Sequence, residues 1–241
     1  MCETSEADTW RYWKCLLFGA ALCLGARCEN TENEEQLFFV TIVPSSFVQN
    51  QRAVMTAVND VLYSVKDITV KQAFKIVGKP RVVAILKFRA LCDWRPLEEA
   101  LAAAGLSIDV KSLYGELDLE NDLKVDKELL ANAQPPSNIS GEFIYLLDVT
   151  LLMSGQTGAS YKEELRSCLE LSLKYRANAH KKFLNYNVLG EFPIQMLFFD
   201  VADPKVAESL LWPFNEGPLA MTVSMTRVEN FADYLNNNYC N

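Results

Sequence analysis

Hydrophobic and polar positions change their spacing in a regular order along residues 36–118. Almost every residue from 37 to 43 is apolar, which predicts a buried strand that Pro44 ends. Apolar residues over 54–65 then recur at the i, i+3, i+4 spacing of one helical face. The remaining predicted elements are a hairpin of strands over 69–77 and 82–88, a helix that Pro96 opens and Gly105 caps, and a strand over 108–117. The predicted order is β-α-β-β-α-β.

The same order returns after residue 142. The predicted elements of this second part are strands over 143–152, 183–189, 194–201 and 219–227, a helix over 160–179, a helix that Pro204 opens, and a short terminal helix over 228–238. Val40 aligned with Val149, and Leu97 with Val206, both give an offset of 109 residues. Side-chain identity between the two parts is low, so the evidence for a repeat is the order and spacing of the predicted elements. The expected domains are 36–118 and 142–241, the second with the terminal helix, joined by a linker over 119–141.

Several strands of both parts are apolar on both faces. In the strand at 143–152, Tyr145 and Leu147 fill one face while Ile144 and Leu146 fill the other. A split βαββαβ sheet with its helices on one side exposes its second face, which would then be polar. Here the second face needs a cover, and the sheet of the other repeat can supply it. The sequence therefore predicts an α+β fold of two tandem ferredoxin-like βαββαβ repeats, packed sheet-to-sheet as an intrachain pseudo-dimeric α+β barrel.

The composition is that of a folded chain and argues against several partners. Half of the 241 residues are hydrophobic, which is enough for a sizeable core. The 31 acidic and 23 basic side chains give a net charge of -8, which disfavours nucleic acids and anionic membrane surfaces as partners. The longest apolar run has 12 residues, at 15–26, and a membrane-spanning helix needs about 20. We expect no integral membrane segment, and a monomer or a higher homo-oligomer.

Residues 1–26 have the layout of a secretory signal peptide. Arg11 and Lys14 precede the apolar run, and the small residues Gly25 and Ala26 end it. The alternative is a buried or interfacial helix. The signal predicts that the protein is secreted or resides in the endomembrane lumen, with the cytoplasm as the alternative.

Cysteines and a glycosylation acceptor agree with that compartment. Removal of residues 1–26 leaves four cysteines, an even number that suits an oxidising environment and allows three pairings. The disulfide candidates are Cys28, Cys92, Cys168 and Cys240, although Cys168 also fits the apolar face of a helix as a small hydrophobe. Asn138 begins an Asn-Ile-Ser acceptor triplet in the proline-containing linker and is the candidate glycosylation site.

Part of the second repeat resembles a known family. Residues 196–204 (MLFFDVADP), 206–214 (VAESLLWPF) and 221–223 (MTV) resemble the C-terminal half of muconolactone-isomerase-like domains. That family belongs to the dimeric α+β barrel superfamily, and the resemblance covers about the last 95 residues, whereas 36–118 shares only the element order. The superfamily includes isomerases, cofactor-free monooxygenases and haem-degrading enzymes, so the resemblance implies a fold and no single reaction. The tandem fusion and the signal peptide depart from the family.

Three residues are candidates for acid–base chemistry. Asp148 interrupts an apolar strand, where a charge needs either a partner or a function, and a satisfied structural carboxylate is the alternative. His180 is the only histidine, and a solvated position at a helix end is its alternative. As an axial ligand to haem, His180 has no supporting motif. Tyr145 would polarise a substrate carbonyl, together with Tyr175, if both line the same cavity as Asp148.

Aromatic and methionine residues are candidates for enclosing a flat apolar ligand, although such sets also form cores. The candidates are Trp94, Tyr175, Phe198, Trp212 and Met221. The sequence contains no nucleotide-binding loop, GxSxG elbow, HExxH helix or zinc-type cysteine spacing, so we expect no cofactor and no metal. We expect a secreted module that binds a small apolar molecule or another protein. The alternative function is a cofactor-independent isomerase or monooxygenase that acts on a small apolar carbonyl compound.

Overall fold

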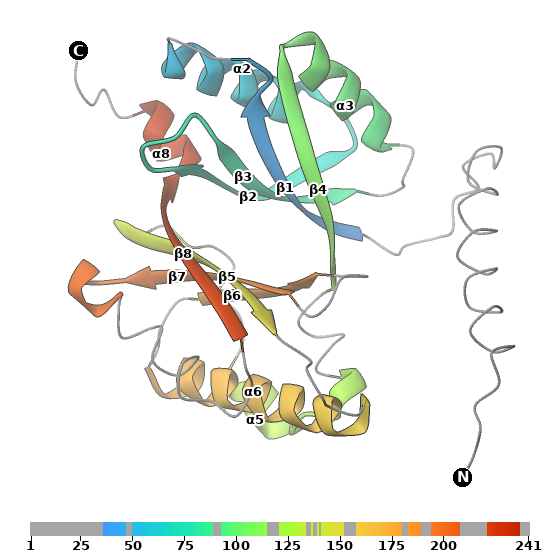
Figure 1. Cartoon of the computed structure of the whole chain (residues 1–241), viewed down its shortest axis with the longest axis vertical. Helices are drawn as coiled ribbons and strands as arrows, with labels where there is room; N and C mark the ends of the chain where they lie inside the picture. Colours follow the sequence, from blue (N-terminus) through green and yellow to red (C-terminus); the bar gives the residue numbers. More distant parts are fainter. Residues whose placement is uncertain are drawn as a thin grey trace, which may run out of the picture.

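The chain forms a closed barrel of eight strands. The computed structural model describes residues 36–46, 50–88, 93–114, 121–133, 136, 139, 141–151, 158–179, 183–188, 194–207 and 221–236. Neighbouring strands of the barrel follow the order β1-β3-β2-β8-β5-β7-β6-β4, and every pair is antiparallel. Two four-stranded sheets face each other, and helices cover the outside of each sheet (Figure 1).

The first half of the barrel has the order β4-β1-β3-β2 of a ferredoxin-like sheet. Its elements are β1 (Gln36–Pro44), α2 (Gln51–Ser64), β2 (Ile68–Ile76), β3 (Val82–Phe88), α3 (Trp94–Ala103) and β4 (Leu106–Tyr114). Asn50 caps the N-terminus of α2, and its Oδ1 accepts a hydrogen bond of 3.1 Å from the Ala53 amide. Its apolar stripe of Val54, Met55, Val58 and Leu62 is buried against the sheet, as the helical spacing predicts.

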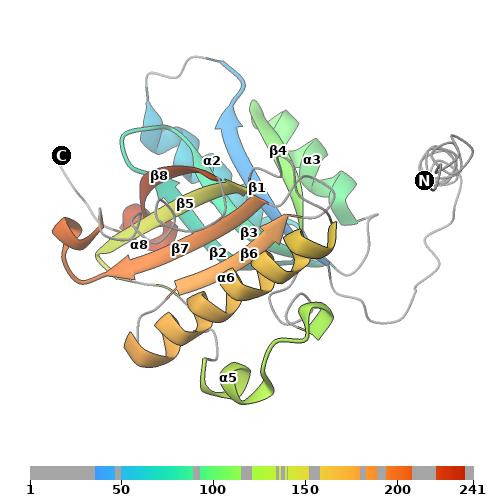
Figure 2. The same ribbon diagram turned by 60° about the horizontal axis from the view of Figure 1, so that its bottom comes forward.

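The second half repeats this arrangement with the order β8-β5-β7-β6. Its elements are β5 (Phe143–Leu151), α6 (Gly158–Ala179), β6 (Phe183–Val188), β7 (Ile194–Val201), the 3-10 turn η2 (Pro204–Val206), β8 (Met221–Asn230) and α8 (Phe231–Asn236). Helix α6 lies along the outer face of this sheet (Figure 2). The predicted fold class, two ferredoxin-like repeats packed as a pseudo-dimeric barrel within one chain, is confirmed.

Two short seams join the halves. At one seam β2 pairs with β8 through Phe74↔Asn230, Lys75↔Glu229 and Ile76↔Val228. At the other, β4 pairs with β6 only through Leu113↔Val188 and Tyr114↔Asn187. Helix α8 adds a further connection, because it follows β8 yet packs Phe231 into the core beneath the helices of the first half.

Three apolar cores result from strands with two buried faces. One core lies between the first sheet and its helices, and a second lies between the second sheet and α6. The third fills the barrel between the sheets with side chains from both halves, among them Phe39, Phe74, Ile144, Leu146 and Phe198. This third core explains why the strands lack the polar face of a one-sided sheet.

The structure differs from the predicted elements at several boundaries. Strand β8 continues to Asn230, through three residues that were predicted to be helical, because its last residues pair with β2 across the seam. Pro96 is the third residue of α3, which begins at Trp94, and Pro204 begins a 3-10 turn. The linker contains α5 (Lys127–Asn132), which lies beside α6 (Figure 2). No helix in the described ranges is long and apolar enough to cross a membrane.

Several predictions concern residues outside the described ranges. Residues 1–35, with the predicted signal peptide and Cys28, lie there, as do Cys92, Asn138, His180, Trp212 and Cys240. Only the backbone is described at Cys168 and Tyr175. Nothing described in the structure supports a disulfide, a glycan or a signal, so these remain predictions. Ile139, which follows Asn138, is fully buried in the core between the sheets.

Gly105 joins α3 to β4 in a left-handed conformation, with φ of +71°. An added Cβ would meet no atom within 4 Å, so the backbone conformation alone requires glycine here. We expect Gly105→Ala to lower the free energy of unfolding by about 1 kcal/mol in urea titrations. Glu98→Ala, an exposed substitution on the same helix, serves as the control. An unchanged urea midpoint for Gly105→Ala would contradict this conformation.

Candidate functional site

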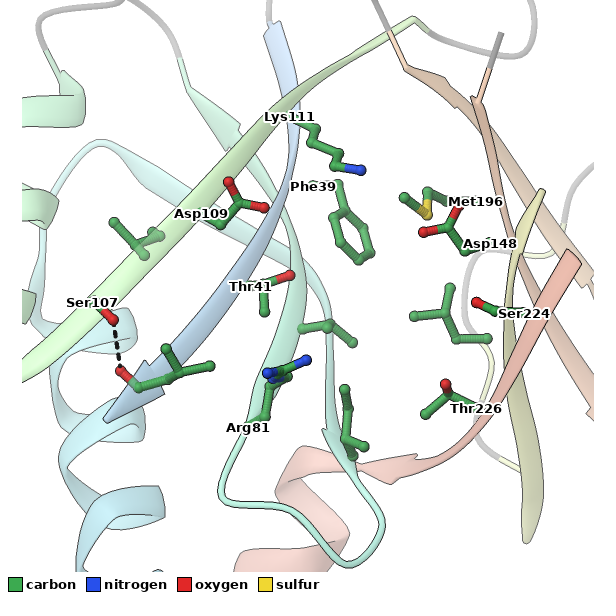
Figure 3. A pocket seen from close by; sticks show the side chains of 15 residues that line it. Phe39, Thr41, Arg81, Ser107, Asp109, Lys111, Asp148, Met196, Ser224 and Thr226 are labelled. Atoms are coloured by element: carbon green, nitrogen blue, oxygen red, sulfur yellow. Dashed lines mark hydrogen bonds between the residues drawn. The ribbon is translucent and has the colours of Figure 1, made fainter. Parts of the chain in front are cut away.

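A cavity of about 460 Å³ opens between the two sheets at one end of the barrel. Strands of both halves line it: β1, β3 and β4 of the first half face β5, β7 and β8 of the second (Figure 3). The site is therefore incomplete in either half alone. A concave site with a few converging polar groups is the usual form of a small-molecule site.

The first half contributes a polar wall to the cavity. On β4 the alternation of a strand places Ser107, Asp109 and Lys111 on the inner face. Strand register sets Asp109 opposite Thr41 and Lys111 opposite Phe39 on β1. The Ser107 hydroxyl donates a 3.4 Å hydrogen bond to the Val43 carbonyl, and Arg81 enters from the start of β3.

The second half contributes an acidic and hydroxyl wall. Asp148 on β5 lies between Met196 on β7 and Ser224 on β8 in the strand register. Thr226 follows two residues after Ser224 and points to the same side (Figure 3). Asp148 and Lys111 point toward one another across the cavity (Figure 3).

Apolar side chains also line the cavity, between and beside the charged ones. They are Phe39, Ile76, Val83, Leu146 and Met196, each of which is buried. The Phe39 ring centroid lies 6.4 Å from that of Phe198, which stacks on Phe74 at 4.8 Å. Because Phe74 and Phe198 are fully buried, the barrel behind Phe39 is filled with side chains.

Charged side chains of both signs line this cavity without forming ion pairs. In the described ranges, no ion pair includes Arg81, Asp109, Lys111 or Asp148, whereas pairs do occur elsewhere, as between Lys75 and Glu229. Asp148 and Lys111 are half-buried, while Arg81 and Asp109 are exposed. Their side chains are accessible from solvent, so a ligand of opposite charge can bind them by displacing water.

The described residues do not form a metal or haem site. No group of three histidine, cysteine, aspartate or glutamate side chains comes together among them. On the helix-facing side of the second sheet, Leu147, Val149, Leu169, Leu173 and Phe199 pack against one another. A haem on this face would displace several of these side chains, so the described part of the chain does not fit one there.

Asp148 lies in the cavity, whereas Tyr145 does not, and His180 lies outside the described residues. Tyr145 points to the opposite face of β5, into the core beneath α6. The alternation along β5 directs Asp148 away from the helices and toward the other sheet.

The three predicted ligand-binding residues whose side chains are described, Trp94, Phe198 and Met221, also lie apart. Trp94 packs against Phe38 and Phe88 beneath the helices of the first half, with ring centroids 5.8 and 5.1 Å away. Phe198 is inside the barrel, and Met221 packs against the core beneath α6. These three side chains belong to three separate cores and do not line one cavity.

Sequence reasoning missed the cationic side of the site. Lys111, Asp109 and Ser107 alternate along β4 with Ile108 and Val110. Both faces of each sheet were expected to be covered. Polar residues on one face of β4 could therefore have indicated a cavity on that face. The identity of the opposing wall was not available from the sequence, since it depends on how the halves pack.

Comparisons with known proteins found structural similarity only. No family model and no curated protein matches the sequence. A variant chlorite dismutase from Candidatus Nitrospira defluvii is similar, with a TM-score of 0.56, 11% identity and coverage of 86% of this chain and 95% of that chain. The same organism's enzyme in complex with imidazole matches with a TM-score of 0.54 and 11% identity, over 86% and 95% of the chains. A putative chlorite dismutase matches with a TM-score of 0.50 and 7% identity, over 83% and 98%.

These neighbours correct the expected function. We expected a secreted binding or interaction module on a scaffold without catalysis, but solved proteins that share the whole tandem barrel are named as enzymes. The neighbours do not favour an isomerase or monooxygenase for apolar carbonyl compounds either. At these identities the similarity shows the fold alone. This chain thus shares the ferredoxin-like α+β fold of these chlorite dismutase structures.

Proposed function

We propose that the protein is an enzyme that acts on a small anionic molecule in the cavity between the two halves of the barrel. Asp148 gives and takes a proton, and Lys111 with Arg81 binds the negative group of the substrate. The observation that carries the proposal is an unpaired carboxylate and an unpaired ammonium that point toward one another across a cavity (Figure 3). The enzyme names of the structural neighbours support catalysis on this barrel.

The two cations determine the class of substrate. A guanidinium binds carboxylates and phosphates through two parallel hydrogen bonds, and a lysine ammonium adds a point charge. Thr41, Ser224 and Thr226 present hydroxyls that can accept or donate further hydrogen bonds. The substrate is therefore anionic, with further polar groups that bind these hydroxyls. This differs from the apolar carbonyl compound that the sequence led us to expect.

The position of Asp148 in the cavity makes its carboxylate suitable for proton transfer. It is half-buried, with the buried Met196 as its register partner on one side and the exposed Ser224 on the other. A bound substrate would exclude water from this carboxylate and hold the transferred proton within the cavity. The likeness of the second half to muconolactone-isomerase-like domains stays a prediction, as does secretion.

Binding of pyruvate, a small carboxylate with exchangeable C–H protons, tests the proposal. We expect Lys111→Gln and Arg81→Gln each to weaken binding about tenfold in calorimetric titrations, since each loses one charge-assisted contact. Lys162→Gln, at an exposed position on α6, should bind pyruvate like the unmodified protein. Affinity that is unchanged in both cavity variants would place the anion elsewhere.

Asp148→Asn separates binding from catalysis. The substitution removes a negative charge, so pyruvate should bind equally or more tightly. Exchange of its methyl protons for deuterium, followed by proton NMR in D₂O, should fall at least a hundredfold if Asp148 is the base. Asp60→Asn on α2 is the control, because Asp60 is exposed and remote from the cavity. Exchange that persists in Asp148→Asn would contradict the assigned role.

A further inference from the structure

We infer that the substrate of this cavity is a small amino acid, whose ammonium group binds Asp109 while its carboxylate binds Lys111 and Arg81. This inference rests on the proposed function, because it keeps the anionic group of the substrate at the two cations. It adds a second, positively charged group to the substrate and names the residue that recognises it.

The charges on the described lining of the cavity are balanced. Lys111 and Arg81 are positive and Asp109 and Asp148 are negative, so these side chains together have no net charge. A cavity that binds a simple anion gains from a positive net charge, because carboxylates in its wall repel the ligand. The whole chain, with a net charge of -8, also repels small anions at long range. A ligand with one negative and one positive group avoids both costs.

Both signs of charge occur on the same strand. Asp109 and Lys111 are two residues apart on β4, and both side chains lie on its cavity-facing side (Figure 3). Two residues of a strand span about 7 Å, so both side chains can reach one small molecule. An anionic group held by Lys111 therefore has the Asp109 carboxylate within reach on the same strand. An ammonium group in the same molecule replaces that repulsion by attraction.

Asp109 is the carboxylate available to the ammonium group. Among the described residues it has no ion-pair partner, and its side chain is exposed. Its register partner on β1 is Thr41, whose hydroxyl can accept a further hydrogen bond from the ammonium. An ammonium bound directly to Asp148 would stabilise the ionised carboxylate and weaken it as a base. The two carboxylates of the cavity therefore have different tasks.

Calorimetric titration of the full chain with matched pairs of ligands tests the inference. The pairs are racemic alanine and lactate, β-alanine and β-hydroxypropionate, and γ-aminobutyrate and γ-hydroxybutyrate. Within each pair an ammonium group replaces a hydroxyl, while the carboxylate and the carbon chain are the same. At neutral pH we expect at least one amino acid to bind about tenfold more tightly than its hydroxy acid, because it gains a charge-assisted hydrogen bond.

Asp109→Asn should remove this preference. The amino acid should lose about tenfold in affinity, whereas the hydroxy acid should bind equally or more tightly, because a repelling charge is gone. Asp148→Asn should retain the preference, since Asp148 is not the partner of the ammonium. Asp60→Asn, an exposed substitution on α2, is the matched control and should bind all six ligands like the unmodified protein.

The possible results separate this inference from the proposed function. Equal affinities within every pair in the unmodified protein would overturn the amino group of the substrate. A preference that persists in Asp109→Asn and disappears in Asp148→Asn would overturn the role given to Asp109. Hydroxy acids that bind without any dependence on Lys111 or Arg81 would instead overturn the proposed function.

Discussion

Phe198→Ala is expected to lower the free energy of unfolding by about 3–5 kcal/mol. The ring is fully buried in the core between the sheets and stacks on Phe74 at a centroid distance of 4.8 Å. It also lies 6.4 Å from the rings of Phe39 and Tyr186, so its loss removes contacts to both halves. Phe198 is surrounded by buried side chains of a packed core, so most of the cavity cost should remain.

Urea titration followed by far-UV circular dichroism measures this effect. Tyr63→Ala is the control, because that ring is 62% exposed on α2 and should change stability by less than about 0.5 kcal/mol. The two halves should still unfold in one transition, since the third core is common to both. A cost below about 1 kcal/mol for Phe198→Ala would mean that the barrel interior is not packed as described.

Lys75→Ala is expected to cost about 2–3 kcal/mol at the seam between β2 and β8. The Lys75 side chain is 5% exposed, and its Nζ lies 3.4 Å from Glu229 Oε1 and 3.2 Å from the Ile76 carbonyl oxygen. Nζ also lies 4.6 Å from the centre of the Tyr234 ring on α8. Glu229 is 33% exposed, so its carboxylate can regain water when the lysine is lost, which keeps the cost below that of a fully buried pair.

Lys75→Met separates packing from charge. Methionine retains an unbranched stem, so this variant should lose only about 1 kcal/mol, the value of the missing hydrogen bonds. Lys71→Ala, at an exposed position on the same strand, should be close to neutral. Equal losses in Lys75→Met and Lys75→Ala would show that the charge, and not the stem, holds the seam. The free energy of unfolding from urea titrations decides between the two.

The spacing of hydrophobic residues was sufficient to predict most elements and the barrel. Strands β1 and β5 have apolar residues on both faces, and a sheet buried on both sides requires a second layer opposite its helices. The element order then identified that layer as the other repeat. Asp148 was also recognisable in advance, because a carboxylate within an apolar strand is expensive without a partner or a role.

The end of β8 and the position of α8 were not predictable in this way. Val228–Asn230 have no local pattern that distinguishes a strand from the start of a helix. They become a strand because β2 supplies hydrogen-bonding partners from a segment more than 150 residues earlier, as the Lys75–Glu229 separation of 154 residues illustrates. Secondary-structure propensity depends on residues that are close in the sequence, so it cannot reveal such a distant partner.

The sequence by itself determined most of the secondary structure, the repeat and the need for two facing sheets, because each follows from the periodicity of side chains along one segment. Only the tertiary structure decided which residues share the cavity. Lys111 lies on β4, Arg81 directly precedes β3, and Asp148 lies on β5 in the opposite half of the barrel. Their meeting depends on how two short seams align the halves, with three paired residues at β2–β8 and two at β4–β6. That alignment is set by packing across the barrel, a property that no single segment of the chain contains.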